Sequence, residues 1–168
     1  ERAVADAVGM GAKGRAFRSQ RLVRLRNHVA ILKRIELLIR ARRPLRPGML
    51  IRWYALLSGG TGVSSVGGET AERLRAVTER AQSPQARIGP ACREIALQYA
   101  QLVADAIFPG FNGLIARLFM HYQLRRAGLP GVVPDADTPQ ALLQDPARLA
   151  GLLLQWIEKA YDRAGKRC

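Results

Sequence analysis

The sequence predicts an all-α protein, a compact bundle of six or seven helices. Leu, Ile, Val and Ala supply most of the apolar residues, while aromatic residues make up only 6% of the chain, a balance that suits helices better than a sandwich or a barrel. Apolar residues recur at spacings of three and four in several segments, and no segment shows the alternation of a strand. With 168 residues, the chain is long enough to bury a core within one domain.

The N-terminal region is predicted to contain an arm followed by a helix. Residues 1–18 carry three glycines and no long apolar periodicity, so we expect a flexible basic arm there, loose or weakly helical. Residues 19–168 are expected to form a single helical domain, whose first helix begins at about Ser19. The apolar residues of this helix are Leu22, Leu25, Val29, Leu32 and Ile35.

Proline and glycine mark the next boundaries. Pro47 is well placed for the first turn of a second helix, which ends at Ser58. The glycine-rich segment 58–68 lacks the Lys-Ser/Thr ending of a phosphate-binding P-loop. It is interpreted as a surface connection, with a ligand-covering flap as the alternative. A third helix is predicted over residues 69–82, with acidic residues in its first turn.

Three further helices are predicted in the C-terminal half. Gly89-Pro90 opens the fourth, and the fifth follows a tight loop at 108–113. The fifth stops at Gly128, because a glycine with a proline just beyond it is a common helix end. Residues 129–144 form a long connection, and the last helix begins at Asp145-Pro146.

The charge of the chain is large and uneven. The net charge is +14, and residues 1–52 hold 14 Lys and Arg against 3 Asp and Glu. Such asymmetry predicts an anionic partner: nucleic acid, an acidic membrane surface or an acidic protein. Solvated basic faces without a partner remain the alternative for each arginine. The candidate polyanion contacts are Arg21, Arg24, Arg34, Arg40, Arg42 and Arg43.

Several functional classes are not indicated. Cys92 and Cys168 are isolated, so they make neither a disulfide framework nor a CxxC metal site, and two free thiols in a reducing compartment are expected. With His28 and His121 as the only histidines, no structural metal is expected. No apolar run is long enough to span a membrane, and no signal peptide is visible. A cytoplasmic location is therefore expected, with a secreted effector as the alternative.

Residues 106–117 are the main candidate for a functional site. Turn residues are concentrated between two predicted helices, and backbone N–H groups at a helix N-terminus form a ready-made anion site. Asn112-Gly113 and the guanidinium of Arg117 would bind the anion, either a nucleotide or another phosphate-type group. A simple turn at Asn112-Gly113 and a structural ion pair for Arg117 are the alternatives.

The segment around this loop resembles the core of the Fic family (Fic/Doc, also called Fido). The family signature is His-x-Phe-x-Asp/Glu-Gly-Asn-Gly-Arg-x-x-Arg between two helices. Here Leu-Phe-Met-His-Tyr-Gln-Leu-Arg-Arg-Ala-Gly-Leu-Pro (118–130) is similar to the family's next helix. Residues 43–57 are similar to the helix before its target-binding flap, so the resemblance covers roughly 43–132.

The match inside the signature is partial. Phe108, Asn112, Gly113 and Arg117 fall on the Phe, the Asn, the second Gly and the final Arg. Four positions depart from it: Ala106 replaces the general-base His, Gly110 the magnesium-holding acid, Phe111 the first Gly, and Leu114 the first phosphate-contacting Arg. Phe111 could block the approach of a phosphate, because that position normally needs bare backbone.

The resemblance implies a protein adenylyltransferase, which transfers AMP to a hydroxyl group of a target protein (AMPylation), but the departures remove its chemistry. Ala106 cannot accept a proton and Gly110 cannot hold a metal ion. His121 is interpreted as a helix-surface or interhelical histidine rather than a replacement base. The spacing of Ser65 and Glu69 matches a regulatory motif of the family and is interpreted as coincidence. We therefore expect a Fic-fold pseudoenzyme; the alternatives are a basic module that binds nucleic acid or an acidic protein, and an active transferase with a rewired site.

Overall fold

The computed structural model describes residues 2–60, 67–82, 87–132 and 145–165; for residues 2–20 it describes the backbone alone. Within these ranges the chain forms six α-helices and no strand, which confirms the predicted all-α class. The helices are α1 (Arg2–Arg40), α2 (Pro47–Leu57), α3 (Gly68–Arg80), α4 (Ile88–Ala104), α5 (Asn112–Arg126) and α7 (Pro146–Gly165).

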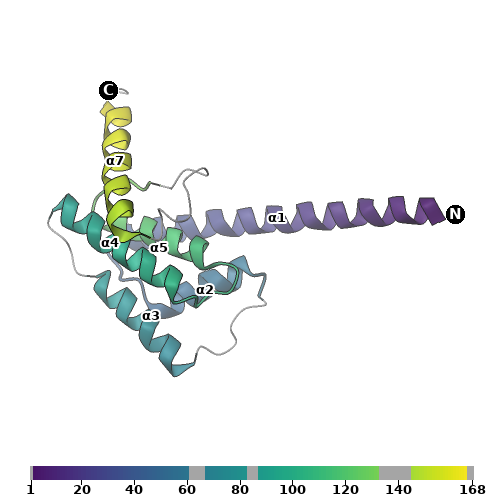
Figure 1. Cartoon of the computed structure of the whole chain (residues 1–168), viewed down its shortest axis with the longest axis horizontal. Coiled ribbons are helices and arrows are strands. Elements are labelled where there is room, and N and C mark those ends of the chain that lie inside the picture. Colours follow the sequence, from purple (N-terminus) through teal and green to yellow (C-terminus); the bar gives the residue numbers. More distant parts are fainter. Residues whose placement is uncertain (1, 61–66, 83–86, 133–144, 166–168) are drawn as a thin grey trace.

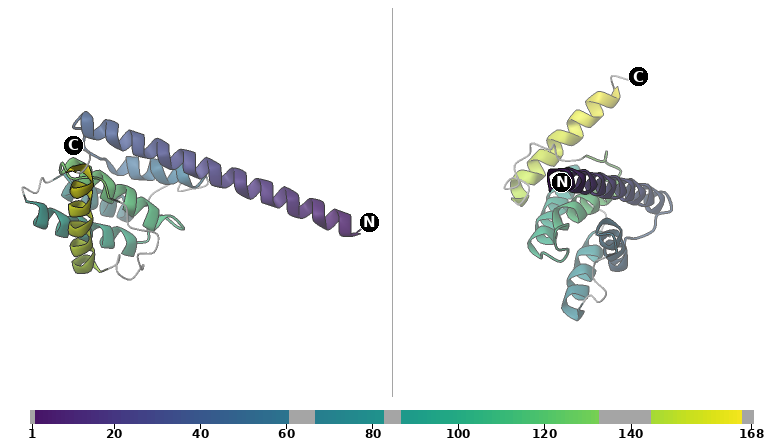
Figure 2. Two further views of the ribbon diagram at one scale, coloured as in Figure 1. Left: turned by 90° about the horizontal axis from the view of Figure 1, so that it is seen from above. Right: turned by 90° about the vertical axis from the view of Figure 1, so that its right-hand side faces the viewer.

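The helices pack around α4 and α5 (Figure 1). Helix α4 packs against both α5 and α7, and α1 packs against α5 and α2. Helix α3 packs against α2 on the side of the body away from α7. The N-terminal part of α1 extends far beyond the other helices, as the left-hand view of Figure 2 shows.

The core lies between α4 and α5. Its largest fully buried side chains include Tyr99 on α4, Tyr122 and Phe119 on α5, and Phe108 in the loop between these helices. Ile31 and Ile35 on α1 are also fully buried. The loop that carries the candidate site is therefore anchored in the core by an aromatic side chain.

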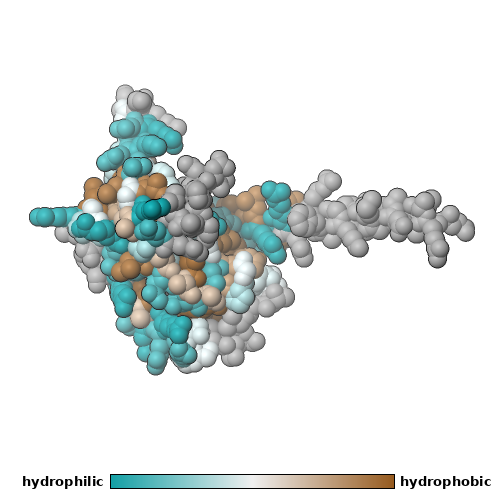
Figure 3. All heavy atoms as spheres, viewed as in Figure 1, coloured by the Kyte–Doolittle hydropathy of each residue, from teal (hydrophilic) through white to brown (hydrophobic). Residues whose placement is uncertain are grey.

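The start of α1 differs from the prediction. The helix begins at Arg2 rather than near Ser19, so residues 2–18, expected to be loose or weakly helical, are the first turns of α1. The apolar residues Leu22, Leu25 and Val29 are exposed by 66%, 60% and 43%, whereas Ile35 is buried. Figure 3 shows hydrophobic side chains gathered where α1 leaves the body.

Most other boundaries agree with the sequence. Helix α2 begins at Pro47 and is followed by Ser58, as predicted. Helix α5 ends in a Schellman motif: Gly128 has a φ of 75°, and the N–H of Leu129 donates to the carbonyl of Leu124 at 2.9 Å. Residues 133–144 of the predicted long connection, and Ser65, lie outside the described residues.

Candidate functional site

A tight turn connects α4 to α5. The N–H of Phe111 donates to the carbonyl of Phe108 at 2.9 Å, and Gly110 between them has a φ of 73°. With Pro109 in the second position and glycine in the third, these four residues have the sequence and hydrogen bond of a type II turn. Proline presets its own φ and glycine accepts the positive φ without strain, so the local sequence dictates this geometry.

Asn112 closes the turn and starts α5. Its side-chain oxygen accepts a hydrogen bond from the N–H of Phe108, and the buried ring of Phe108 holds the other end of the turn in the core. In the first turn of α5, the N–H groups of Asn112, Gly113 and Leu114 have no hydrogen-bond acceptor among the described residues. These three donors form the positive end of the helix dipole.

The side chain of Arg117 folds back over this first turn. Its Nη2 atom lies 3.8 Å from the place where a Cβ on Gly113 would stand. Arg117 is half-buried, and no carboxylate of the described residues lies within ion-pair distance of it. Asn112, Gly113 and Arg117 thus share the first turns of α5, and Asn112-Gly113 form the turn and helix start that was their alternative. Arg117 has no ion pair with a described residue, and binding of an anion here stays a prediction.

Two residues that sequence reasoning missed lie near Arg117. Burial lowers the pKa of His28 on α1, and the charge of Arg117 lowers it further. Burial raises the pKa of Tyr99 on α4, while Arg117 opposes the shift, and the Tyr99 hydroxyl is buried with no hydrogen-bond partner in the described structure. Only the packing of α1 and α4 against α5 brings these side chains to Arg117, so no local sequence signal could have found them.

Phe111 is held by neighbours on α1 and α2. Its ring contacts Tyr54 edge-to-face with a centroid separation of 5.7 Å, and the guanidinium carbon of Arg24 lies 5.5 Å from its centroid. Tyr54 also contacts Phe108 at 5.4 Å. The contacts of the Phe111 ring are therefore those of an aromatic cluster with a cation above it.

An open hollow of about 500 Å³ adjoins this loop between α1 and α5. It is lined by Arg21, Leu22, Arg24, Leu25, His28 and Leu114. Among the candidate polyanion contacts, Arg21 and Arg24 therefore lie beside the loop.

The other candidate polyanion contacts lie elsewhere. Arg34 and Arg43 line a different hollow, between α1 and α2. Arg40 ends α1, and Arg42 follows it with a φ of 51°. Both arginines are exposed and line neither hollow. The six arginines therefore do not form one cluster, and binding of nucleic acid stays a prediction.

The positions that replace the catalytic residues are also defined. Ala106 is exposed with a φ of 48°, just after the last turn of α4, and its methyl group carries no proton acceptor. His121 contacts another helix: its Nε2 atom lies 3.7 Å from a carboxylate oxygen of Glu36 on α1. That carboxylate also accepts a 3.0 Å hydrogen bond from Arg125. His121 is thus an interhelical histidine.

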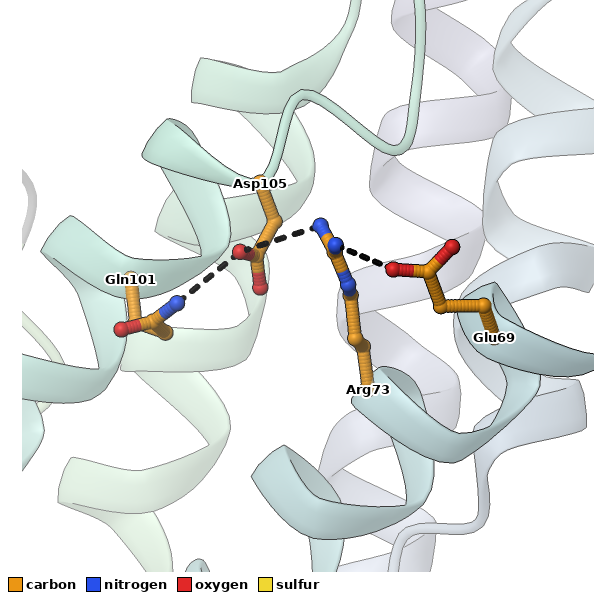
Figure 4. A network of polar contacts seen from close by, with 4 residues as sticks. All are labelled: Glu69, Arg73, Gln101 and Asp105. Carbon is orange, nitrogen blue, oxygen red and sulfur yellow. Dashed lines mark hydrogen bonds and ion pairs between the residues drawn. The ribbon is translucent and has the colours of Figure 1, made fainter.

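Glu69, the other residue of the suspected regulatory motif, is paired elsewhere (Figure 4). Its carboxylate lies 2.6 Å from Arg73, one turn further along α3. Arg73 also lies 3.8 Å from Asp105 at the end of α4, and Asp105 accepts a 2.9 Å hydrogen bond from Gln101. Glu69 and Arg73 thus form part of a contact between α3 and α4.

Searches for related proteins give no assignment. No protein-family model, no curated protein and no solved structure matches the chain. In the ranges with defined coordinates, no group of three or more His, Cys, Asp or Glu side chains could hold a metal ion. No described helix is long and apolar enough to cross a membrane.

Proposed function

We propose that this chain is a Fic-like pseudoenzyme: a helical protein that binds a nucleotide or another phosphate-type anion at the start of α5 and lacks AMP-transfer activity. The observation that carries the proposal is the position of Arg117. Its guanidinium lies over Gly113, in the turn whose first three N–H groups have no acceptor among the described residues, and no described carboxylate pairs with it.

Phosphate oxygens match this arrangement well. Backbone N–H groups at a helix N-terminus donate to an anion along the helix dipole, and a guanidinium offers two parallel donors to the same group. A protonated His28 would add positive charge beside Arg117, and Arg24 brings its guanidinium to the neighbouring Phe111 ring. A nucleotide would add its base and sugar to these contacts, and the adjoining hollow with Leu22, Leu25 and Leu114 offers apolar surface for them.

The loop lacks the proton acceptor and the metal-holding carboxylate that AMP transfer would need. A hydroxyl nucleophile must lose its proton during transfer, and Ala106 offers no lone pair for that proton. Gly110 offers no carboxylate to position a metal ion on the phosphates. Both ring nitrogens of His121 face the protein, Nε2 towards Glu36 and the buried Nδ1 towards Gly131, so neither is open to a substrate hydroxyl in place of the missing base.

The proposal can be tested by calorimetry at low salt. The experiment measures the binding of inorganic phosphate, AMP and ATP to the purified chain. Arg117→Ala should weaken binding roughly 10- to 100-fold, because a charge-assisted hydrogen bond is worth about 1.5–3 kcal/mol. Arg80→Ala, which removes an exposed arginine from α3, is the matched control and should leave binding unchanged. Equal affinities of the wild-type chain and Arg117→Ala would contradict the proposal.

A second measurement separates a pseudoenzyme from a rewired transferase. Incubation with labelled ATP and candidate target proteins should incorporate no AMP into any protein. Incorporation that Arg117→Ala abolishes would overturn the assignment as a pseudoenzyme while leaving the anion site intact. We also propose a cytoplasmic location, because Cys92 is a buried free thiol, as is common in reducing compartments.

A further inference from the structure

A basic groove runs between α1 and α2, on a different pair of helices from the proposed anion site. Two hollows of about 390 and 470 Å³ share the side chains of Arg34 on α1 and Arg52 on α2. The first hollow continues to Leu37, Met49 and Trp53, and the second to Asn27, Leu56 and Gly60. We call this pair of hollows the α1–α2 groove.

Residues that line the α1–α2 groove belong to the hydrophobic core or pack against it. Trp53 is only 2% exposed and belongs to the core cluster, and Leu38 and Met49 pack against that cluster. At the other end, the side-chain amide of Asn27 donates to the carbonyl of Leu56 at 2.7 Å, which ties α1 to the last turn of α2. Leu37 is 63% exposed at the edge, so an apolar group remains available to a partner.

No described acidic residue pairs with the arginines around the groove. Arg34, Arg43 and Arg52 are exposed, and none of them has an ion pair with a described residue. The nearest acid along α1 is Glu36, whose two carboxylate oxygens accept hydrogen bonds from Arg125 on α5 at 3.0 and 3.3 Å. Its charge is therefore already paired with another helix.

We infer that the α1–α2 groove binds an acidic amphipathic helix of a partner protein. Carboxylates on such a helix would pair with Arg34, Arg43 and Arg52, while its apolar side chains would cover Leu37 and Met49. The groove runs along α1 from Asn27 to Ala41, the residue after its end, about 21 Å at 1.5 Å per residue, so a helix of about four turns matches its length. This inference does not depend on the proposed anion site.

The same features disfavour other occupants. An extended peptide would need backbone hydrogen bonds, and the helical backbones on both sides of the groove already use theirs internally, whereas a helix satisfies its own. A polynucleotide would place phosphates over Leu38 and Met49, and the buried Trp53 cannot stack on a base. A second copy of the chain would bring two net charges of +14 together.

The inference can be tested by selection from a displayed peptide library. The library contains amphipathic helices of about 14–18 residues whose polar faces are acidic, neutral or basic in all combinations. The selected peptides should carry acidic residues beside apolar ones at spacings of three and four. Their binding is followed through the fluorescence of Trp53 in a Trp156→Phe background, because the chain has two tryptophans. Selection of neutral or basic peptides would overturn the inference.

Charge-reversal variants locate the binding surface. Arg34→Glu with Arg52→Glu should weaken the selected peptides at least about tenfold, and Leu37→Asp should do the same without touching the core. Arg80→Glu with Arg93→Glu makes the same change of net charge on exposed positions of α3 and α4, and should have a much smaller effect. Equal losses in the two double variants would show attraction to the overall charge and overturn the inference.

Separate measurements distinguish the acidic helix from other occupants of the groove, and the groove from the proposed anion site. A DNA duplex or vesicles containing an anionic phospholipid that bind through Arg34 and Arg52, when no peptide does, would overturn the inference. If the chain self-associates in a sedimentation experiment and Leu37→Asp abolishes this self-association, the inference is also overturned. Arg117→Ala should leave peptide affinity unchanged, so failure of the phosphate site and failure of the groove are distinguishable.

Discussion

The buried hydroxyl of Tyr122 on α5 accepts a hydrogen bond from the backbone N–H of Leu45 at 3.0 Å. Leu45 lies in the connection between α1 and α2, 77 positions away in the sequence, and its side chain is fully buried. Arg126 donates a second hydrogen bond to the same hydroxyl at 2.7 Å. One side chain of the helix that carries the candidate site thus fixes the connection that leads into α2.

We expect Tyr122→Phe to lower the free energy of unfolding by about 1–3 kcal/mol, because it leaves the buried N–H of Leu45 without a partner. Urea denaturation followed by fluorescence measures the change. Tyr161→Phe, at a site on α7 that is 50% exposed, is the control and should have no measurable effect. A loss no larger than that of the control would mean that the hydrogen bond contributes nothing.

Two helices end on non-glycine residues in the left-handed conformation, Arg42 after α1 and Ala106 after α4. A side chain at positive φ costs about 1–2 kcal/mol, partly offset by the extra chain entropy of an unfolded glycine. Arg42→Gly and Ala106→Gly should therefore each stabilise the protein by about 0.5–1 kcal/mol.

Thermal unfolding at constant pH tests this pair of substitutions. Ala104→Gly, inside the last turn of α4, is the matched control and should destabilise, because glycine weakens a helix interior. If Ala106→Gly behaved like Ala104→Gly, the left-handed conformation at residue 106 would not be strained.

Stability should fall as the pH is lowered from 7.5 towards 5. Burial lowers the pKa of His121 below its usual 6.5; Arg125 and His28 act in the same direction and Glu36 opposes them. The pKa of His28 is lowered as well. Below pH 6.5 the unfolded chain therefore binds more protons than the folded chain, until the pH reaches the lowered pKa values of the two histidines in the folded state. Over that range, lowering the pH favours the unfolded chain.

Unfolding midpoints in urea at several pH values measure how steeply stability changes with pH. His121→Gln should make this pH dependence shallower, since one of the two titrating histidines is removed. The lowered pKa of Glu36 acts in a separate window, because its stabilisation is lost only as the pH falls below 4.5 through the folded pKa. A stability that rises between pH 7 and 5 would be incompatible with the burial of His121.

Gly131 packs against the imidazole of His121. A Cβ at this position would stand 2.3 Å from Cε1 of His121, a distance at which one of the two must move. Gly131→Ala should destabilise the protein by about 1–3 kcal/mol, and by much less in a His121→Ala background. A double-mutant cycle on unfolding free energies measures the coupling, and additive effects would show that the ring moves aside without cost.

Local rules predicted most helix boundaries from the sequence. Pro47, Ser58 and Gly128 mark helix ends through their own backbone preferences, which act within a few residues. The predicted start of α1 near Ser19 was wrong: three glycines, Gly9, Gly11 and Gly14, and the lack of a long apolar periodicity favoured a loose or weakly helical arm, whereas the helix begins at Arg2. Each helical glycine costs only about 1 kcal/mol, which a helix already nucleated nearby can tolerate.

The candidate site could be predicted only where it is local. The turn and the first residues of α5 follow from Pro109, Gly110 and Asn112. The neighbours of Arg117 come from α1 and α4, far away in the sequence, and depend on how three helices pack. Periodicity likewise predicted a helix for Leu22 and Leu25 but could not tell that no described helix covers them.

The length of α1 has a consequence for every unfolding experiment. Its 39 residues span about 58 Å, and Figure 2 shows the N-terminal turns standing clear of the body, while Ile31 and Ile35 are locked in the core. Backbone amides in the outer turns should exchange with solvent by fraying, and those near Ile35 only when the whole protein opens. On heating, far-ultraviolet circular dichroism of the Trp156→Phe variant should therefore decline before the fluorescence of Trp53 changes. The two curves will separate even though the domain itself unfolds in one cooperative step.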